Sequence, residues 1–187
     1  MIYLVIGPSC SGKTQFVTNS FMKGNCICYK DLVRVTKSDN AYLIGDYTSD
    51  KKVRGTDRIA RQQLKLIVPQ IIKLFELNDG LDVVAEGVNI CWSFVFEDLL
   101  PYREFVKFMY LRTSKEISLQ RNHIIKSSAS DAWFKSIWTR TNNIFNKYCV
   151  YYDSYVFDTS DNIDFSKISI DNIIFEKYVN AEQKKLF

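Results

Sequence analysis

The feature that most constrains this chain is the glycine-rich stretch GPSCSGKT at residues 7–14, which directly follows the apolar run IYLVI. It matches the pattern G-x-x-x-x-G-K-[ST], whose glycines let the backbone curl so that its N–H groups line a concave anion site. Lys13 would reach the β- and γ-phosphates of a nucleotide, and Thr14 would offer a hydroxyl to Mg²⁺. A helix must follow, with its N-terminus aimed at the same phosphates. The predicted nucleotide-binding residues are Gly7, Ser9, Cys10, Ser11, Gly12, Lys13 and Thr14.

Length and composition set the scale of the fold around this loop. The chain has 187 residues, 47% of them hydrophobic, and no proline-rich or low-complexity stretch divides it. We therefore predict one domain over residues 1–187. The formal net charge of +4 is mild, so any polyanion would be bound by a local cluster of cations rather than by the whole surface.

Cysteine usage and hydropathy predict a cytoplasmic protein with no membrane partner. The five cysteines are an odd number without metal-site spacing, which favours free thiols in a reducing compartment. Residues 1–6 lack a basic leader, and nowhere do about 18 apolar residues follow one another. The single histidine, His123, argues against a histidine-based triad, so acid–base chemistry would fall to carboxylates.

Strand and helix patterns alternate along the chain and predict an α/β fold. This alternation favours a mostly parallel sheet with helices on both faces, in three layers. A turn signal, KSDN, lies between LVRVT and AYLIGDY and predicts a β-hairpin after the second strand. Near the end, SYVFD fits a last strand and KISIDNIIFEKYV a terminal helix. The predicted strands are 2–6, 26–30, 81–86 and 106–112, and the predicted helices are 13–22, 57–78, 92–100, 114–126 and 131–148.

Glu86 is the second chemical signal, because it ends the apolar strand LDVVAE. Ligands of doubly wound sheets bind beyond the carboxyl ends of the strands, so Glu86 and the phosphate loop should face one crevice. There a carboxylate can orient Mg²⁺ or accept a proton from an attacking hydroxyl. The alternative is a solvated acid at a strand end.

The polar stretch GDYTSDKKVRGTDR, residues 45–58, is the third signal. It combines cations that could bind substrate phosphate with carboxylates that could accept a hydroxyl proton. Asp57 is the first candidate for that base and Asp46 the reserve. Alternatively, Thr56 or Asp57 caps the following helix and the lysines are solvated. The predicted substrate-binding residues are Asp46, Tyr47, Lys51, Arg54 and Arg140.

Two further segments carry polar residues at places relevant to phosphate chemistry. Ser114 can cap a helix over 114–126, and Arg121 near its end would serve a lid over about 113–131 or simply pair with the helix dipole. In AWFKSIWTRTNNIFNKY, the apolar stripe at helical spacing predicts core packing rather than a base-stacking surface. The opposite face of that helix carries Arg140 together with Lys135, Asn142 and Asn143.

Taken in order, GPSCSGKT, GDYTSDKKVRGTDR, VVAEG and AWFKSIWTRTNN resemble the phage-type P-loop kinases of the adenylate-kinase-like superfamily, in particular the 5-hydroxymethyluracil DNA kinases. The resemblance covers about residues 1–150. The chain departs from the family at Val88-Asn89, where a charged pair is usual. It also departs at Ser136-Ile137-Trp138, where a glycine–arginine is expected before the threonine. The resemblance implies a P-loop kinase-like fold with a small acceptor-site insertion at about 31–58.

The resemblance also implies an activity: ATP- and Mg²⁺-dependent transfer of the γ-phosphoryl group to a hydroxymethyl on a pyrimidine in DNA. Lys13, Asp57, Glu86 and Arg121 would then be catalytic, and Thr14 and Glu86 would bind the metal. The protein would act in the cytoplasm of an infected host cell. The residues alone leave two alternatives open, a nucleoside monophosphate kinase and a nucleotide-dependent switch or ATPase without an acceptor.

Overall fold

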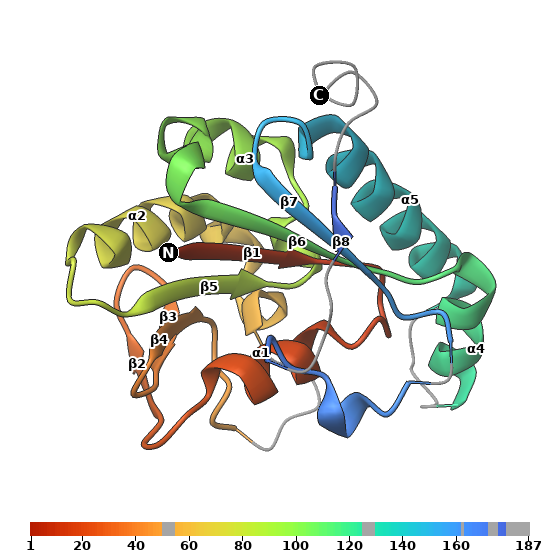
Figure 1. The fold of residues 1–187 in the computed structure, drawn as a ribbon, viewed down its shortest axis with the longest axis horizontal. Helices are drawn as coiled ribbons and strands as arrows, with labels where there is room; N and C mark the ends of the chain where they lie inside the picture. Colours follow the sequence, from red (N-terminus) through yellow and green to blue (C-terminus); the bar gives the residue numbers. More distant parts are fainter. Residues whose placement is uncertain (50–54, 125–129, 162, 172–175, 179–187) are drawn as a thin grey trace.

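The computed structural model describes residues 1–49, 55–124, 130–161, 163–171 and 176–178. Its strands form one sheet in the order β2-β3-β4-β5-β1-β6-β7-β8 (Figure 1). The five central strands are parallel, whereas β2 and β3 at one edge and β8 at the other are antiparallel to their neighbours. The bounds are β1 Ile2–Ile6, β2 Ile27–Lys30, β3 Arg34–Lys37, β4 Ala41–Ile44, β5 Asp82–Glu86, β6 Val106–Arg112, β7 Asp153–Asp158 and β8 Glu176–Lys177.

Helices cover both faces of the sheet (Figure 1). One face carries α2 (Ile67–Glu76), α3 (Ser93–Leu99) and α5 (Asp131–Tyr148), and the other carries α1 (Lys13–Phe21) with the 3₁₀ helix Phe165–Lys167. Strands buried on both faces are almost entirely apolar, which explains the uninterrupted run in β1. The predicted α/β class and mostly parallel sheet are confirmed.

The packing follows from the period-2 alternation of β1. Ile2, Leu4 and Ile6 face the larger core, whereas Tyr3 and Val5 face α1. The Tyr3 and Phe21 rings lie 4.9 Å apart, which fixes α1 against the sheet. On the other face, six residues of the α5 stripe are buried, as predicted: Phe134, Ile137, Thr141, Ile144, Phe145 and Tyr148.

The predicted helix over 57–78 is wrong in its first part. Two 3₁₀ helices, Gly55–Arg58 and Arg61–Leu66, precede α2, which begins only at Ile67. The side chains of Thr56 and Asp57 bind the end of β5 instead of capping a helix that continues from them. Because these two side chains bond to the main chain at the end of β5, residues 55–58 form a 3₁₀ helix and do not continue as an α-helix.

The prediction for the C-terminal segment is also wrong where the segment is described. Residues 176–177 are not helical but form β8, in which Lys177 pairs with Tyr155 of β7. Without β8 this edge of β7 would be unpaired, and the N–H of Tyr178 adds a hydrogen bond to the main-chain oxygen of Ser154 at 2.8 Å. The predicted strand SYVFD is confirmed as β7.

The hairpin prediction is confirmed, but β4 also pairs in parallel with β5. The hairpin is therefore part of the main sheet. The strand predicted at 26–30 lies at the sheet edge as β2. The last helix before β7, α5, has the predicted bounds, and α4 (Lys115–Ile124) is capped by Ser114, whose Oγ accepts from the Ile117 N–H at 3.2 Å.

The helices that follow the two adjacent parallel strands β1 and β5 lie on opposite faces of the sheet. After β1 it enters α1 on one face, and after β5 it enters α3 on the other. Such a reversal opens a crevice at the carboxyl ends of the two strands. The glycine-rich loop follows β1 and Glu86 ends β5, so both lie at this crevice.

Candidate phosphate-binding site

Glycines stand in the loop at two places where a side chain would not fit. Gly12 has φ of 86°, and a Cβ atom there would lie 2.4 Å from the ring of Phe165. A Cβ on Gly7 would lie 2.5 Å from the main-chain oxygen of Leu111 in β6. The loop is thus curled tightly between α1, β6 and the segment around Phe165, with glycine at both fixed positions of the motif.

Lys13 is the first residue of α1 and is only 7% exposed. Its Nζ donates a 2.8 Å hydrogen bond to the main-chain oxygen of Pro8. The ammonium is therefore held inside the loop, where a phosphate oxygen can replace the carbonyl as its partner. Its positive charge also acts on the carboxylates of Asp57 and Glu86.

Glu86 lies directly beside the loop, because Val5 of β1 and Glu86 of β5 are register partners. The side chain is buried, and its Oε1 accepts a 2.9 Å hydrogen bond from Thr14 Oγ1. This bond joins the threonine of the phosphate loop to the strand-end carboxylate. Glu86 is therefore not a solvated acid.

Asp57 reaches the same place from the 3₁₀ helix Gly55–Arg58. Its Oδ1 accepts hydrogen bonds from the N–H groups of Val88 at 2.8 Å and Asn89 at 3.2 Å, just beyond β5. The neighbouring Thr56 Oγ1 donates to the main-chain oxygen of Glu86 at 2.5 Å. These bonds bring the two carboxylates close enough for the charge of Asp57 to act on Glu86.

Burial and mutual repulsion disturb the protonation of this pair. Burial raises the pKa of Glu86 to about 7, and the negative charge of Asp57 adds to the rise, while Lys13, Thr14 and Tyr47 oppose it. Burial also raises the pKa of Asp57, against the charges of Lys13 and Arg140 and two main-chain N–H groups. Buried carboxylates in such a pair favour a proton or a cation, as groups at functional sites often do.

Tyr47 and Gly55 lie against the Glu86 side chain. The Tyr47 side chain is buried, and its hydroxyl interacts with the Glu86 carboxylate. Gly55 has φ of 65°, and a Cβ there would lie 2.3 Å from Glu86 Oε1 and 2.8 Å from the Tyr47 hydroxyl. Tyr47, predicted to bind substrate, therefore lies against Glu86 inside the protein.

Helix α4 contacts the phosphate loop through two side chains. Ser118 Oγ donates to the main-chain oxygen of Ser9 at 2.7 Å. Arg121 donates to the oxygens of Cys10 at 3.4 Å and Asp161 at 2.9 Å, and its guanidinium lies 4.9 Å from the centre of the Phe165 ring. Arg121 thus stands at the loop and not merely at the end of a helix. Residues 125–129 of the predicted lid lie outside the described residues.

Arg140 projects from α5 toward the turn that holds Asp57. Its Nη2 donates to the main-chain oxygen of Val88 at 3.2 Å, and its guanidinium lies 4.6 Å from the centre of the Trp92 ring. Its Nε is buried without a hydrogen-bond partner in the described part of the chain. Arg140 is therefore fixed at the rim of the carboxylate pocket.

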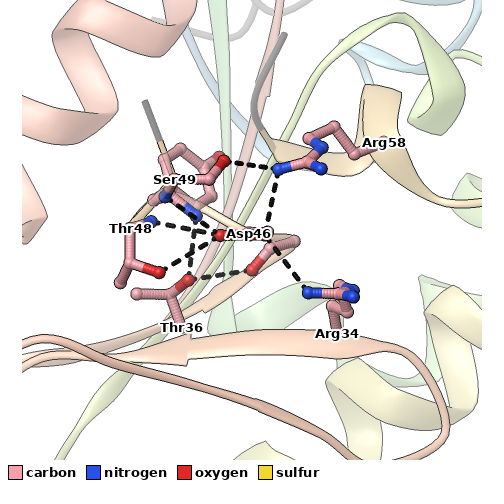
Figure 2. A network of polar contacts seen from close by, with 8 residues as sticks. Arg34, Thr36, Asp46, Thr48, Ser49 and Arg58 are labelled. Atoms are coloured by element: carbon pink, nitrogen blue, oxygen red, sulfur yellow. Dashed lines mark hydrogen bonds and ion pairs between the residues drawn. The ribbon is translucent and has the colours of Figure 1, made fainter. Parts of the chain in front are cut away.

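Asp46 is the centre of a separate polar network, which Figure 2 shows. Its Oδ2 binds Arg58 at 2.9 Å and Arg34 at 3.2 Å. Its Oδ1 accepts from Thr48 and Ser49, including both main-chain N–H groups. Through these contacts Asp46, which follows β4, holds Arg58 in place, and Arg58 is the neighbour of Asp57.

Two predicted substrate-binding residues, Lys51 and Arg54, lie outside the described residues. The predicted site residues do not include Arg58, which binds Asp46, Trp92, which stacks on Arg140, or Phe165, which lies against Gly12. Only Arg58 carried a signal, because it shares a charged segment with Asp46. Trp92 and Phe165 depend on contacts across distant parts of the chain.

The residues fit a magnesium ion bound together with phosphates. In the described part of the chain, no three His, Cys, Asp or Glu side chains cluster as a complete metal site. Mg²⁺ needs no such cluster, since it commonly binds one or two carboxylates with substrate phosphates and water. Thr14 and Glu86 provide adjacent oxygen ligands, and a divalent cation would offset the repulsion between Glu86 and Asp57.

Comparison with known proteins adds no relative. No family model matches the chain, and no curated protein matches it. Within the described ranges, no helix is long and apolar enough to cross a membrane. All five cysteines are free, as predicted.

Replacing Glu86 with Gln should stabilise the protein above pH 7. The folded-state pKa of about 7 exceeds the ordinary value of 4.5, so ionisation costs stability as pH rises through this range. We expect the free energy of unfolding of Glu86→Gln at pH 8 to exceed that of the wild type by about 1 to 3 kcal/mol, with no gain below pH 4.5. Urea denaturation at both pH values measures this. The exposed control Glu104→Gln should change little, and a loss of stability at pH 8 in Glu86→Gln would contradict the repulsion.

Replacing Asp46 with Asn should destabilise the protein above pH 4. Burial raises the pKa of Asp46, but hydrogen bonds from Thr48 and Ser49 and the charge of Arg58 outweigh it and lower the pKa below 3.8. The stability contributed by the carboxylate is thus present above that value and lost as pH falls through the lowered pKa. We expect a loss of about 1 to 3 kcal/mol at pH 7, against almost none for the exposed Asp98→Asn. Equal unfolding midpoints of Asp46→Asn and wild type at pH 7 would refute this role.

Proposed function

We propose that the chain is an ATP- and Mg²⁺-dependent phosphotransferase of the P-loop kinase type. The observation that carries this proposal is the 2.9 Å hydrogen bond between Thr14 of the phosphate loop and the buried Glu86. It joins a candidate triphosphate site to a pair of carboxylates. A site for nucleotide binding alone would not need two buried carboxylates whose repulsion costs stability.

Each residue has a distinct part in this proposal. The loop N–H groups and Lys13 would bind the β- and γ-phosphates, and the buried ammonium would neutralise their charge. Thr14 and Glu86 would hold Mg²⁺, which would supply positive charge beside the phosphates. Arg121, which already contacts the loop at Cys10, would stabilise the phosphoryl group from the α4 side.

Asp57 would accept the proton of the acceptor hydroxyl. It faces the turn at Val88 and Asn89, whereas Glu86 is committed to Thr14. In the transfer, the hydroxyl oxygen bonds to the γ-phosphorus while the bond from that phosphorus to the β,γ-bridging oxygen breaks. ADP leaves, and the hydroxyl proton passes to the Asp57 carboxylate.

For the acceptor we propose a hydroxymethyl group on a modified pyrimidine, 5-hydroxymethyluracil, in DNA. The order of the four motifs supports it, and so does the position of GTD, which brings Asp57 to the end of β5. A nucleoside monophosphate is the second candidate. It is favoured by a pocket of about 360 Å³ beside Asn89, whose lining includes Arg61 and Arg140 and which is large enough for one nucleotide.

Replacing Lys13 with Ala should reduce phosphoryl transfer by about 100-fold or more, because the ammonium stabilises charge on the transferring group. The measurement supplies radiolabelled ATP with 5-hydroxymethyluracil DNA, with deoxynucleoside monophosphates, and without acceptor. Lys23→Ala, an exposed lysine just beyond the same helix, is the matched control and should retain activity.

Label on DNA or on the monophosphate identifies the acceptor. Release of phosphate alone at the same rate in all three mixtures would contradict a kinase and indicate a switch or ATPase. Wild-type turnover by a folded Lys13→Ala protein would refute the role of the loop.

A further inference from the structure

Two pockets meet at the Trp92–Arg140 pair, just beyond the carboxylates. The first, of about 360 Å³, contains Trp92, Trp133 and Arg140 together with Val88 and Asn89. The second, of about 570 Å³, lies between the start of α3 and the exposed face of α5. Trp92 and Arg140 line both pockets, so the two pockets are adjacent, and together they are called the groove. The first pocket includes Asn89, whose N–H donates to Asp57.

The first pocket is equipped to hold a flat ring. Trp92 and Trp133 are 40% and 44% exposed, although large aromatic side chains are usually buried when they serve only packing. Both rings line the pocket whose wall includes Asn89, which binds Asp57. Nucleobases stack on exposed aromatic rings of this kind.

The second pocket is equipped to hold a phosphate. Lys135 and Arg140 line it together with the hydroxyls of Ser136 and Thr139 and the amide of Asn143. Among the described residues that line the two pockets there is no acidic side chain. Positive charge without opposing carboxylates is complementary to a phosphodiester backbone.

Arg140 lies between the two pockets and lines both of them. The Val88 oxygen and the Trp92 ring fix its guanidinium. Its buried Nε has no hydrogen-bond partner in the described part of the chain.

We propose that this groove binds the acceptor as part of a polynucleotide, with the target base stacked on Trp92 and Trp133 and a flanking phosphodiester on Lys135 and Arg140. The proposal rests on the proposed function for the chemistry at Asp57. A base would have to leave its duplex stack to enter the pocket, which costs little in single strands or at weakened pairs. The groove thus favours DNA over a free nucleotide, since a free nucleotide has no flanking phosphodiester.

Equilibrium binding tests the groove without relying on transfer. The probes are a labelled single-stranded oligonucleotide that carries one 5-hydroxymethyluracil and the free 5-hydroxymethyldeoxyuridine monophosphate. Trp92→Ala and Trp133→Ala should each weaken oligonucleotide binding about tenfold or more, whereas Trp→Phe at either position should largely restore it. The control is Tyr151→Ala, which removes an exposed aromatic ring beyond the other end of α5 and should bind normally.

The Lys135→Ala variant distinguishes binding of a polynucleotide from binding of a mononucleotide. It should weaken oligonucleotide binding, reduce the slope of log K against log salt by about 0.7, and leave the affinity for the free monophosphate unchanged. Lys23→Ala should change neither. Normal oligonucleotide binding by both Trp→Ala variants would overturn the base pocket, and an equal loss for both probes in Lys135→Ala would overturn the phosphodiester site.

Failure of the groove differs from failure of the phosphotransferase. If the wild type transfers phosphate but the tryptophan variants bind and react normally, the groove is wrong and the kinase stands. If tryptophan-dependent binding is found and the wild type transfers no phosphate to either probe, the groove stands and the kinase is wrong.

Discussion

The hydrogen bond between Thr14 and Glu86 is the contact on which the rest of the site depends. It exists because β1 and β5 are parallel neighbours in a register that pairs Val5 with Glu86. The loop after β1 and the carboxylate at the end of β5 therefore meet at the same edge of the sheet. From Glu86 outward, the Thr56 bond to its main-chain oxygen and the N–H groups that hold Asp57 complete the pocket. Two carboxylates are thus kept together despite burial and repulsion, a common cost of functional sites.

A second layer of contacts holds this pocket in shape. A Cβ on Gly45 would lie 2.3 Å from the main chain of Gly55, so the two ends of the 45–55 segment are in direct backbone contact. Asp46 then binds Arg58 and fixes the short helix that carries Asp57. The position of the candidate base therefore depends on residues that lie outside the glycine-rich loop and outside the carboxylate pair. Asp46 is part of this support.

Local patterns predicted most of the sheet and the glycine-rich turn between β1 and α1, because those features depend on neighbouring residues. The run IYLVI, the glycine spacing and the α5 stripe each carry their own period. The start of α2 was missed because Thr56 and Asp57 bind a strand end about thirty residues away, a contact that no local pattern encodes. The C-terminal segment was read as a helix for a similar reason, since its pairing with β7 is set by an open sheet edge. At the site, Glu86 was predictable from the strand before it, whereas Trp92 and Phe165 required the fold.

The most direct test of the central claim, that the loop and Glu86 form one site for a magnesium-bound nucleotide, is a crystal structure with Mg²⁺ and a non-hydrolysable ATP analogue. We expect the β- and γ-phosphates within the loop of residues 7–14 and Lys13 Nζ moved from the Pro8 oxygen to a phosphate oxygen. Mg²⁺ should lie about 2.1 Å from Thr14 Oγ1, with Glu86 as a ligand directly or through water. A triphosphate bound elsewhere, or a Thr14–Glu86 hydrogen bond left intact with no metal beside it, would contradict the account.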